Sequence, residues 1–177
     1  MEWKLIEDCI DSTKFPFQSK GKVATYYLKL GRNAEVEIEK YDADLIKEKF
    51  KIINRIGDSF FRVYKNVNTG KGIKLVEKLI LVETKGKSND YFEQLEQSFE
   101  LFKSIKGNIH GRFVGLNVPA IFDRNLKPKL NTLQSKFAKK NGTLRYGNRI
   151  MREEIISIEE SELSGENKNS RTEKIKL

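Results

Sequence analysis

The segment 79–86, LILVETKG, constrains the fold more than any other part of the chain. Its four consecutive apolar residues, followed closely by a glycine, predict a short buried strand. Side chains alternate along a strand, so Glu83 and Lys85 share one face with Leu79 and Leu81. Removing a charge from water is costly unless the charge is paired or bound to a metal. Either this is the solvated end of an ordinary strand, with a surface ion pair worth less than about 1 kcal/mol, or two charged groups are held there for chemistry.

The composition is that of one globular domain. The chain has 177 residues, of which 38% are hydrophobic and 33% charged, which is enough for a single well-packed core. No apolar run approaches the roughly 20 residues of a membrane-spanning helix, and the acidic residues near the N-terminus do not suit a signal peptide. Cys9 is the only cysteine and His110 the only histidine, which argues against disulfides and against a zinc site. We therefore expect a soluble, cytoplasmic protein.

The positive charge is concentrated in one segment. Residues 124–152 contain nine lysines and arginines and no acidic residue, whereas the rest of the chain carries 25 residues of each sign. A local positive field of this kind suits a polyanion, above all the phosphates of a nucleic acid. The alternative is a solvated basic surface without a ligand. The candidate phosphate-binding residues are Lys136, Lys139, Lys140, Arg145 and Arg149.

Hydrophobic periodicity predicts a mixed α/β chain. Its expected elements are a β-meander (15–40), a helix (43–56), two strands (59–65 and 73–85), a second helix (90–106), a strand (112–122) and a partly helical basic segment (130–140). Asp42 is expected to cap the first helix and Gly57 to end it, and Asp90 has capping-box spacing to Glu93. The strand 112–122 should run parallel to 73–85, because a helix connects them. We expect one domain over residues 1–160 and a loose polar tail over 161–177.

The loop between the strands 59–65 and 73–85 sets their register. A two-residue turn at Gly70 and Lys71, with glycine in the first central position of a type II′ turn, places Asp58 opposite Glu83. Their Cβ atoms would then lie about 5 Å apart. Two such carboxylates can hold Mg²⁺, which takes oxygen ligands and usually only one or two carboxylates. Lys85, on the face of Glu83, can orient a water or stabilise charge on a phosphate.

These residues resemble a known group of enzymes. An aspartate followed by strand, loop and strand ending in VETKG resembles the PD-(D/E)xK nuclease superfamily, which includes many restriction endonucleases. The order of elements over about residues 42–122 is similar to that family's αβββαβ core, a central mixed sheet flanked by helices, with one strand unassigned. The resemblance implies that Asp58, Glu83 and Lys85 are catalytic, with Asp58 and Glu83 as metal ligands. It implies the backbone carbonyl of Thr84 as a further ligand.

The resemblance also implies a function. A member of this family would be an endonuclease that uses Mg²⁺ or Mn²⁺ to hydrolyse phosphodiester bonds in double-stranded DNA, as a restriction-type homodimer. The basic segment 124–152 would then grip the duplex. The alternative is a non-catalytic nucleic-acid-binding protein, in which the basic segment binds without metal and the sequence of Glu83 and Lys85 is incidental. A requirement for metal in DNA cleavage distinguishes the two.

Overall fold

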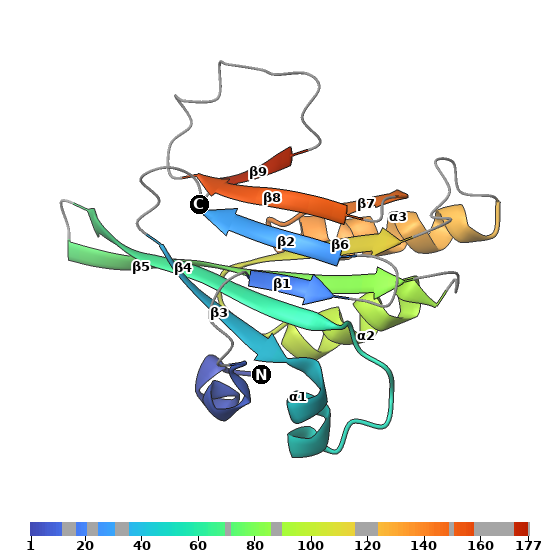
Figure 1. Ribbon diagram of the computed structural model, residues 1–177, viewed down its shortest axis with the longest axis horizontal. Coiled ribbons are helices and arrows are strands. Elements are labelled where there is room, and N and C mark those ends of the chain that lie inside the picture. Colours follow the sequence, from blue (N-terminus) through green and yellow to red (C-terminus); the bar gives the residue numbers. More distant parts are fainter. Residues whose placement is uncertain are drawn as a thin grey trace.

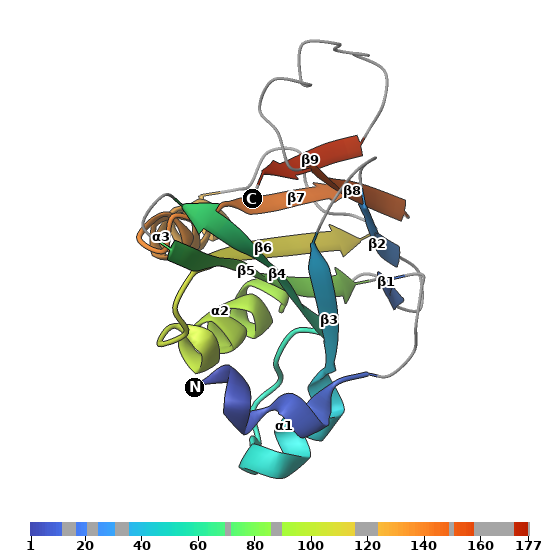
Figure 2. The same cartoon turned by 90° about the vertical axis from the view of Figure 1, so that its left-hand side faces the viewer.

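The protein is built in three layers. The computed structural model describes residues 1–11, 17–20, 25–30, 36–69, 72–85, 90–115, 124–148, 151–157 and 172–176. In this part of the chain, a five-stranded sheet is covered by helices on one face and by a four-stranded sheet on the other (Figures 1 and 2). None of the described helices is long and apolar enough to cross a membrane.

The larger sheet is mixed. Its strands, in spatial order, are β3 (Glu37–Asp42), β4 (Ser59–Thr69), β5 (Gly72–Lys85), β6 (Asn108–Gly115) and β7 (Leu144–Asn148). Neighbours from β3 to β5 are antiparallel, and those from β5 to β7 are parallel. The parallel strands are joined through α2 (Tyr91–Phe102) and α3 (Leu126–Ala138). The predicted class, with a central mixed sheet and with β6 parallel to β5, is confirmed.

The register of the β4–β5 hairpin is the one that the sequence predicts. The pairs run from Thr69 and Gly72 to Ser59 and Val82, as a two-residue turn at positions 70 and 71 requires. The turn itself lies outside the described residues. Asp58 and Glu83 each lie one residue beyond the last pair, Ser59 and Val82.

The smaller sheet joins segments from both ends of the chain. Its strands, in spatial order, are β1 (Phe17–Lys20), β2 (Thr25–Leu30), β8 (Met151–Ser157) and β9 (Thr172–Lys176). The prediction of one meander over 15–40 was wrong, because β1 and β2 belong to this sheet whereas β3 pairs with β4. Residues 172–176 of the expected polar tail form β9, whose backbone pairs in parallel with β8. Backbone pairing of an edge strand needs no apolar periodicity, so the sequence pattern did not reveal it.

The first helix is shorter than its apolar residues suggest. In α1 (Ala43–Phe50) the predicted cap is present, since Asp42 Oδ1 accepts hydrogen bonds from the amides of the second and third helical residues. The helix ends where Lys51 adopts a left-handed conformation with φ 52°. The following amide, of Ile52, then bonds to the carbonyl of Lys47 and closes the last turn. Gly57 therefore does not end the helix, and Ile53, expected on its apolar face, is 99% exposed.

The second helix forms the centre of the core. Its predicted apolar residues are all buried: Phe92, Leu95, Phe99, Phe102 and, just beyond the helix, Ile105. Phe102 packs against Phe60 of β4, and Phe99 against Phe137 of α3, with ring centroids 4.9 and 5.1 Å apart. The expected capping box is absent, because the side chain of Asp90 does not cap α2. It accepts a hydrogen bond from Gln94 Nε2 and pairs with Arg55 instead.

The opposite face of the larger sheet has its own apolar cluster. Tyr26 and Leu28 of β2 are buried against β4 and β5, and the rings of Tyr26 and Phe61 lie 5.9 Å apart. Two 3₁₀ turns at the N-terminus, η1 (Trp3–Leu5) and η2 (Glu7–Cys9), pack on the helical side. The predicted strand 112–122 begins earlier, at Asn108, and its part beyond Gly115 lies outside the described residues.

Candidate functional site

The predicted catalytic residues lie where the three parallel strands of the larger sheet end. Lys85 closes β5 beside Gly115 of β6, which is paired in turn with Asn148 of β7. Because β4 is antiparallel to β5, its first residue and the preceding Asp58 lie at the same end. In sheets with parallel strands, ligands bind outside the carboxyl ends of those strands. This edge is therefore a suitable place for a binding site.

Asp58 is fixed to β5 by its side chain. Its Oδ2 accepts a hydrogen bond of 2.7 Å from the amide of Thr84 and a second one from the Thr84 hydroxyl. The preceding residue, Gly57, is also fixed in position, because its amide donates a hydrogen bond to Ser98 Oγ of α2. A Cβ at position 57 would lie 2.8 Å from the carbonyl oxygen of Val82, so only glycine fits this close approach. Asp58 remains exposed at the surface.

Glu83 is the opposite case, a carboxylate with no exposed surface. Its exposed fraction is 0%, and it lies on the face of β5 that packs under the helices, together with Leu79 and Leu81. Its neighbour on β6 is Phe113, whose ring stacks on Tyr146 with centroids 5.2 Å apart. The position of Lys85 follows from the strand, but its side chain lies outside the described residues. The sequence prediction of charged side chains at the inner face of a buried strand thus holds for Glu83.

The donor atoms at this edge suit a hard cation. Among the described residues, no group of three or more His, Cys, Asp or Glu side chains gathers around a common point. Asp58 and Glu83 instead flank the segment at Thr84, whose carbonyl is the third predicted ligand. A set of one or two carboxylates and a carbonyl oxygen is what Mg²⁺ uses in proteins, and the lack of thiolate or imidazole in this set disfavours zinc. By residue type, this set therefore fits Mg²⁺.

The basic residues predicted to bind phosphate differ in their surroundings. Lys136 forms ion pairs of 2.7 Å with Glu96 and with Glu100 of α2, and these hydrogen bonds raise its pKa. Lys140 donates to the carbonyl of Ile105. These two lysines therefore fasten α3 to α2 and to the segment after it.

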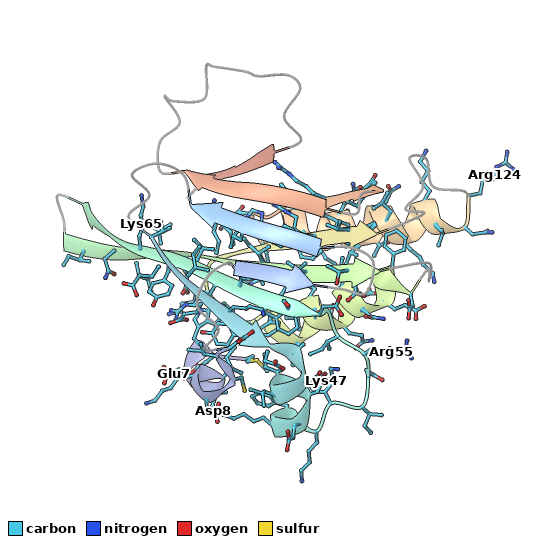
Figure 3. All side chains as sticks on the ribbon, viewed as in Figure 1. Glu7, Asp8, Lys47, Arg55, Lys65 and Arg124 are labelled. Carbon is cyan, nitrogen blue, oxygen red and sulfur yellow. The ribbon has the colours of Figure 1, made fainter. Side chains whose placement is uncertain are left out.

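The other predicted phosphate ligands are placed differently again. Lys139 is exposed, and Arg145 is half-buried in β7 beside Arg112. Arg149 lies outside the described residues. Further exposed cations stand at the start of α3, where Lys127 follows Arg124, a residue at the outer edge of the molecule (Figure 3). A phosphate backbone could therefore approach α3 at its two ends.

Sequence reasoning missed a group of buried basic side chains on the face of the larger sheet opposite Glu83. Lys78, His110 and Arg112 are 7%, 7% and 1% exposed, and Arg112 Nη1 donates to the carbonyl of Thr143. Burial, and then the charge of Arg112, lowers the pKa of Lys78 to about 8 and that of His110 to about 3. The amide of Thr143 donates to His110 Nδ1, which is consistent with a neutral ring. In the sequence, the burial of Lys78 was indicated only by its position on the same strand face as apolar Ile80.

No family model, curated protein or solved structure matches this chain. Function must therefore be argued from the geometry of its own residues, because a fold class alone does not imply an activity.

Proposed function

We propose that this protein is a Mg²⁺-dependent endodeoxyribonuclease of the PD-(D/E)xK type, with Asp58, Glu83 and Lys85 as its catalytic residues. The pairing of strands in the larger sheet supports this proposal. An antiparallel unit of β3, β4 and β5 is followed by the crossover helix α2 and by β6 parallel to β5. This sheet topology is similar to that of the αβββαβ core, but the chain order differs, because β3 precedes α1 and α1 leads into β4.

The observation that carries the proposal is the hairpin register. Its last pair is Ser59 and Val82, so an exposed carboxylate, Asp58, and a buried one, Glu83, each lie one residue beyond that pair. Both hydrogen bonds from Thr84 end on Asp58 Oδ2, so Oδ1 is the oxygen that we assign to the metal. The burial of Glu83 and the hydrogen bonds of Asp58 would hold the two ligands in place before metal binds. Bound Mg²⁺ would supply an activated water and offset negative charge on the phosphate.

Charge supports DNA as the substrate. The net charge of +9 favours a polyanion, and exposed cations lie at both ends of α3, at Arg124, Lys127 and Lys139. By analogy with the family, we assign double-stranded DNA as the substrate, and a homodimer as the form that cuts both strands.

Plasmid cleavage tests the proposal. Supercoiled DNA should be nicked or linearised by the wild-type protein with millimolar Mg²⁺ and left intact with EDTA. Glu83→Gln keeps the shape of the side chain and should abolish cleavage while changing metal-free DNA affinity by less than a few-fold. The matched control is Glu93→Gln, which neutralises a side chain of α2 that is 68% exposed and should cut like wild type.

Two results would contradict the assignment. Undiminished cutting by Glu83→Gln would remove this site from the reaction. Tight DNA binding without cleavage at any Mg²⁺ or Mn²⁺ concentration would favour the non-catalytic nucleic-acid-binding protein instead.

A further inference from the structure

Strands β4 and β5 continue as a two-stranded arm beyond the larger sheet. β3 pairs with β4 only as far as Tyr64, and β6 pairs with β5 only from Lys78 onward. In the described part of the chain, residues 65–69 and 72–77 therefore have ladder partners only in each other. We call these two segments the β4–β5 arm. Figure 1 shows it extending past the rest of the molecule on the left-hand side.

The arm is basic and carries apolar side chains in solvent. Over residues 65–77 the sequence holds three lysines, of which Lys71 lies in the turn outside the described residues, and one acidic residue, Glu77, which pairs with Arg62 at the base of the arm. Ile73 is 76% exposed and Leu75 is 45% exposed, so neither is used by the core. Asn66, which pairs with Leu75, is also exposed. Lysines bind phosphates, amides bind phosphates or base edges, and apolar groups contact the thymine methyl, so this mixture suits a DNA groove.

The dimensions of the arm agree with a groove of duplex DNA. From Lys65 to Thr69 the strand extends about 14 Å, at about 3.4 Å per residue. The major groove is about 12 Å wide and about 8.5 Å deep and admits a two-stranded β-ribbon. Glu83 follows Gly72 by 11 positions on the same strand, which corresponds to about 36 Å. That distance is close to one helical turn of DNA, roughly 34–36 Å.

We propose that the β4–β5 arm is a DNA-binding ribbon that enters the major groove about one helical turn from the phosphodiester bond to be cut at Asp58 and Glu83. The inference rests on the DNA substrate proposed above. The lysines of the arm contact phosphates, and the exposed polar and apolar side chains of the arm contact the groove. Charge selects DNA over a second copy of this chain as the occupant. Pairing two such arms edge to edge would bring like charges together, and lysine on an exposed strand edge is a common means of preventing that pairing.

The arm can be tested without disturbing the fold. Lys65, half-buried at the base of the arm (Figure 3), and Lys74 are both replaced in the variant Lys65→Ala/Lys74→Ala. The control is Lys4→Ala/Lys47→Ala, which removes the same charge from segments where both signs are balanced. Affinity for a 30-base-pair duplex is measured in EDTA over a range of salt concentrations, and cleavage is measured with Mg²⁺. Size-exclusion chromatography with light scattering gives the oligomeric state.

The arm variant should bind about tenfold more weakly, and its slope of log affinity against log salt should be shallower by about 1–2. Cleavage should show a raised KM with kcat unchanged, and the control should match wild type. A wild-type salt slope in the arm variant would overturn the inference. So would a changed oligomeric state with unchanged affinity, which would make the arm a contact between copies.

The two proposals fail in different ways. Arm-dependent binding by a wild-type protein that never cuts would leave the arm standing and refute the nuclease. If the arm variant cut DNA with the KM and kcat of wild type, the arm inference would be refuted and the nuclease would stand. A wild-type protein that does not bind DNA would refute both.

Discussion

Asp58 is expected to have a structural and a catalytic role, and two substitutions separate them. Both hydrogen bonds from Thr84 end on Asp58 Oδ2, one from the amide at 2.7 Å and one from the hydroxyl. Asp58→Ala leaves both donors without this acceptor. A buried donor that loses its partner costs about 1–3 kcal/mol. The side chain of Asp58 is at the surface and water can reach the gap, so the lower end applies to each donor and the sum is about 2 kcal/mol.

Asp58→Asn should behave differently. The amide oxygen of asparagine can accept both hydrogen bonds, so the loss of charge alone should cost less than about 1 kcal/mol. Urea midpoints report the difference, because a protein of this size loses about 2 kcal/mol of unfolding free energy for each 1 M urea. The alanine variant should therefore unfold at about 1 M lower urea than wild type, and the asparagine variant within about 0.5 M of it. Both should lose Mg²⁺-dependent cleavage, because neither keeps the charged metal ligand.

The assay pairs urea unfolding, followed by far-ultraviolet circular dichroism, with plasmid cleavage. Asp44→Asn is the control, since that carboxylate is 89% exposed on α1 and its change should alter neither measurement. If the asparagine variant were as unstable as the alanine variant, the hydrogen-bond account would be wrong. If the asparagine variant cut DNA at the wild-type rate, Asp58 would be a structural residue only.

Three further predictions concern metal, pH and salt. Millimolar Mg²⁺ should raise the melting temperature of wild type but not of Glu83→Gln, because a ligand that binds only the native state stabilises it by mass action; an equal shift in scanning fluorimetry would exclude this metal site. Burial lowers the pKa of His110 to about 3, so the unfolded chain takes up the proton first as pH falls. The unfolding free energy should then drop below pH 6.5 by up to about 1.4 kcal/mol per pH unit, and His110→Gln should lose this component in urea titrations from pH 7 to pH 4. Lys136→Ala should lower the unfolding free energy by about 0.5–1 kcal/mol and leave the salt slope of DNA binding unchanged. Lys139→Ala should make that slope shallower by about 0.9 without affecting stability. The reverse pattern would show that Lys136 is the phosphate contact.

The parts of the fold that the sequence predicted well are those with a local signal. The buried face of α2 repeats at helical period, and all of its predicted apolar residues are in the core. The β4–β5 register follows from one short turn and the alternation of side chains on either side of it. Asp58 and Glu83 each lie one residue beyond the last pair of that register.

The parts that could not be predicted depend on contacts between distant segments. β2 pairs in parallel with β8, and the partners Tyr26 and Arg152 are 126 positions apart, so no local pattern marks the smaller sheet. The end of α1 has a similar cause. Lys51 takes the left-handed conformation that usually selects glycine, and the glycine that the sequence offered, Gly57, is used instead for close approach to β5.

The charge of the basic segment illustrates the same limit at the level of function. Counting residues predicts a phosphate-binding surface over 124–152, but a count cannot show which cations already have partners within the protein. Lys136 holds two glutamates of α2, and Lys140 holds a backbone carbonyl. Each would have to give up a contact before it could bind a phosphate, whereas Lys139 is exposed and makes no side-chain ion pair with the described residues. The number of cations available to DNA on this segment is therefore smaller than its net charge suggests. Lysines outside the segment, on the β4–β5 arm, should then make a larger share of the phosphate contacts.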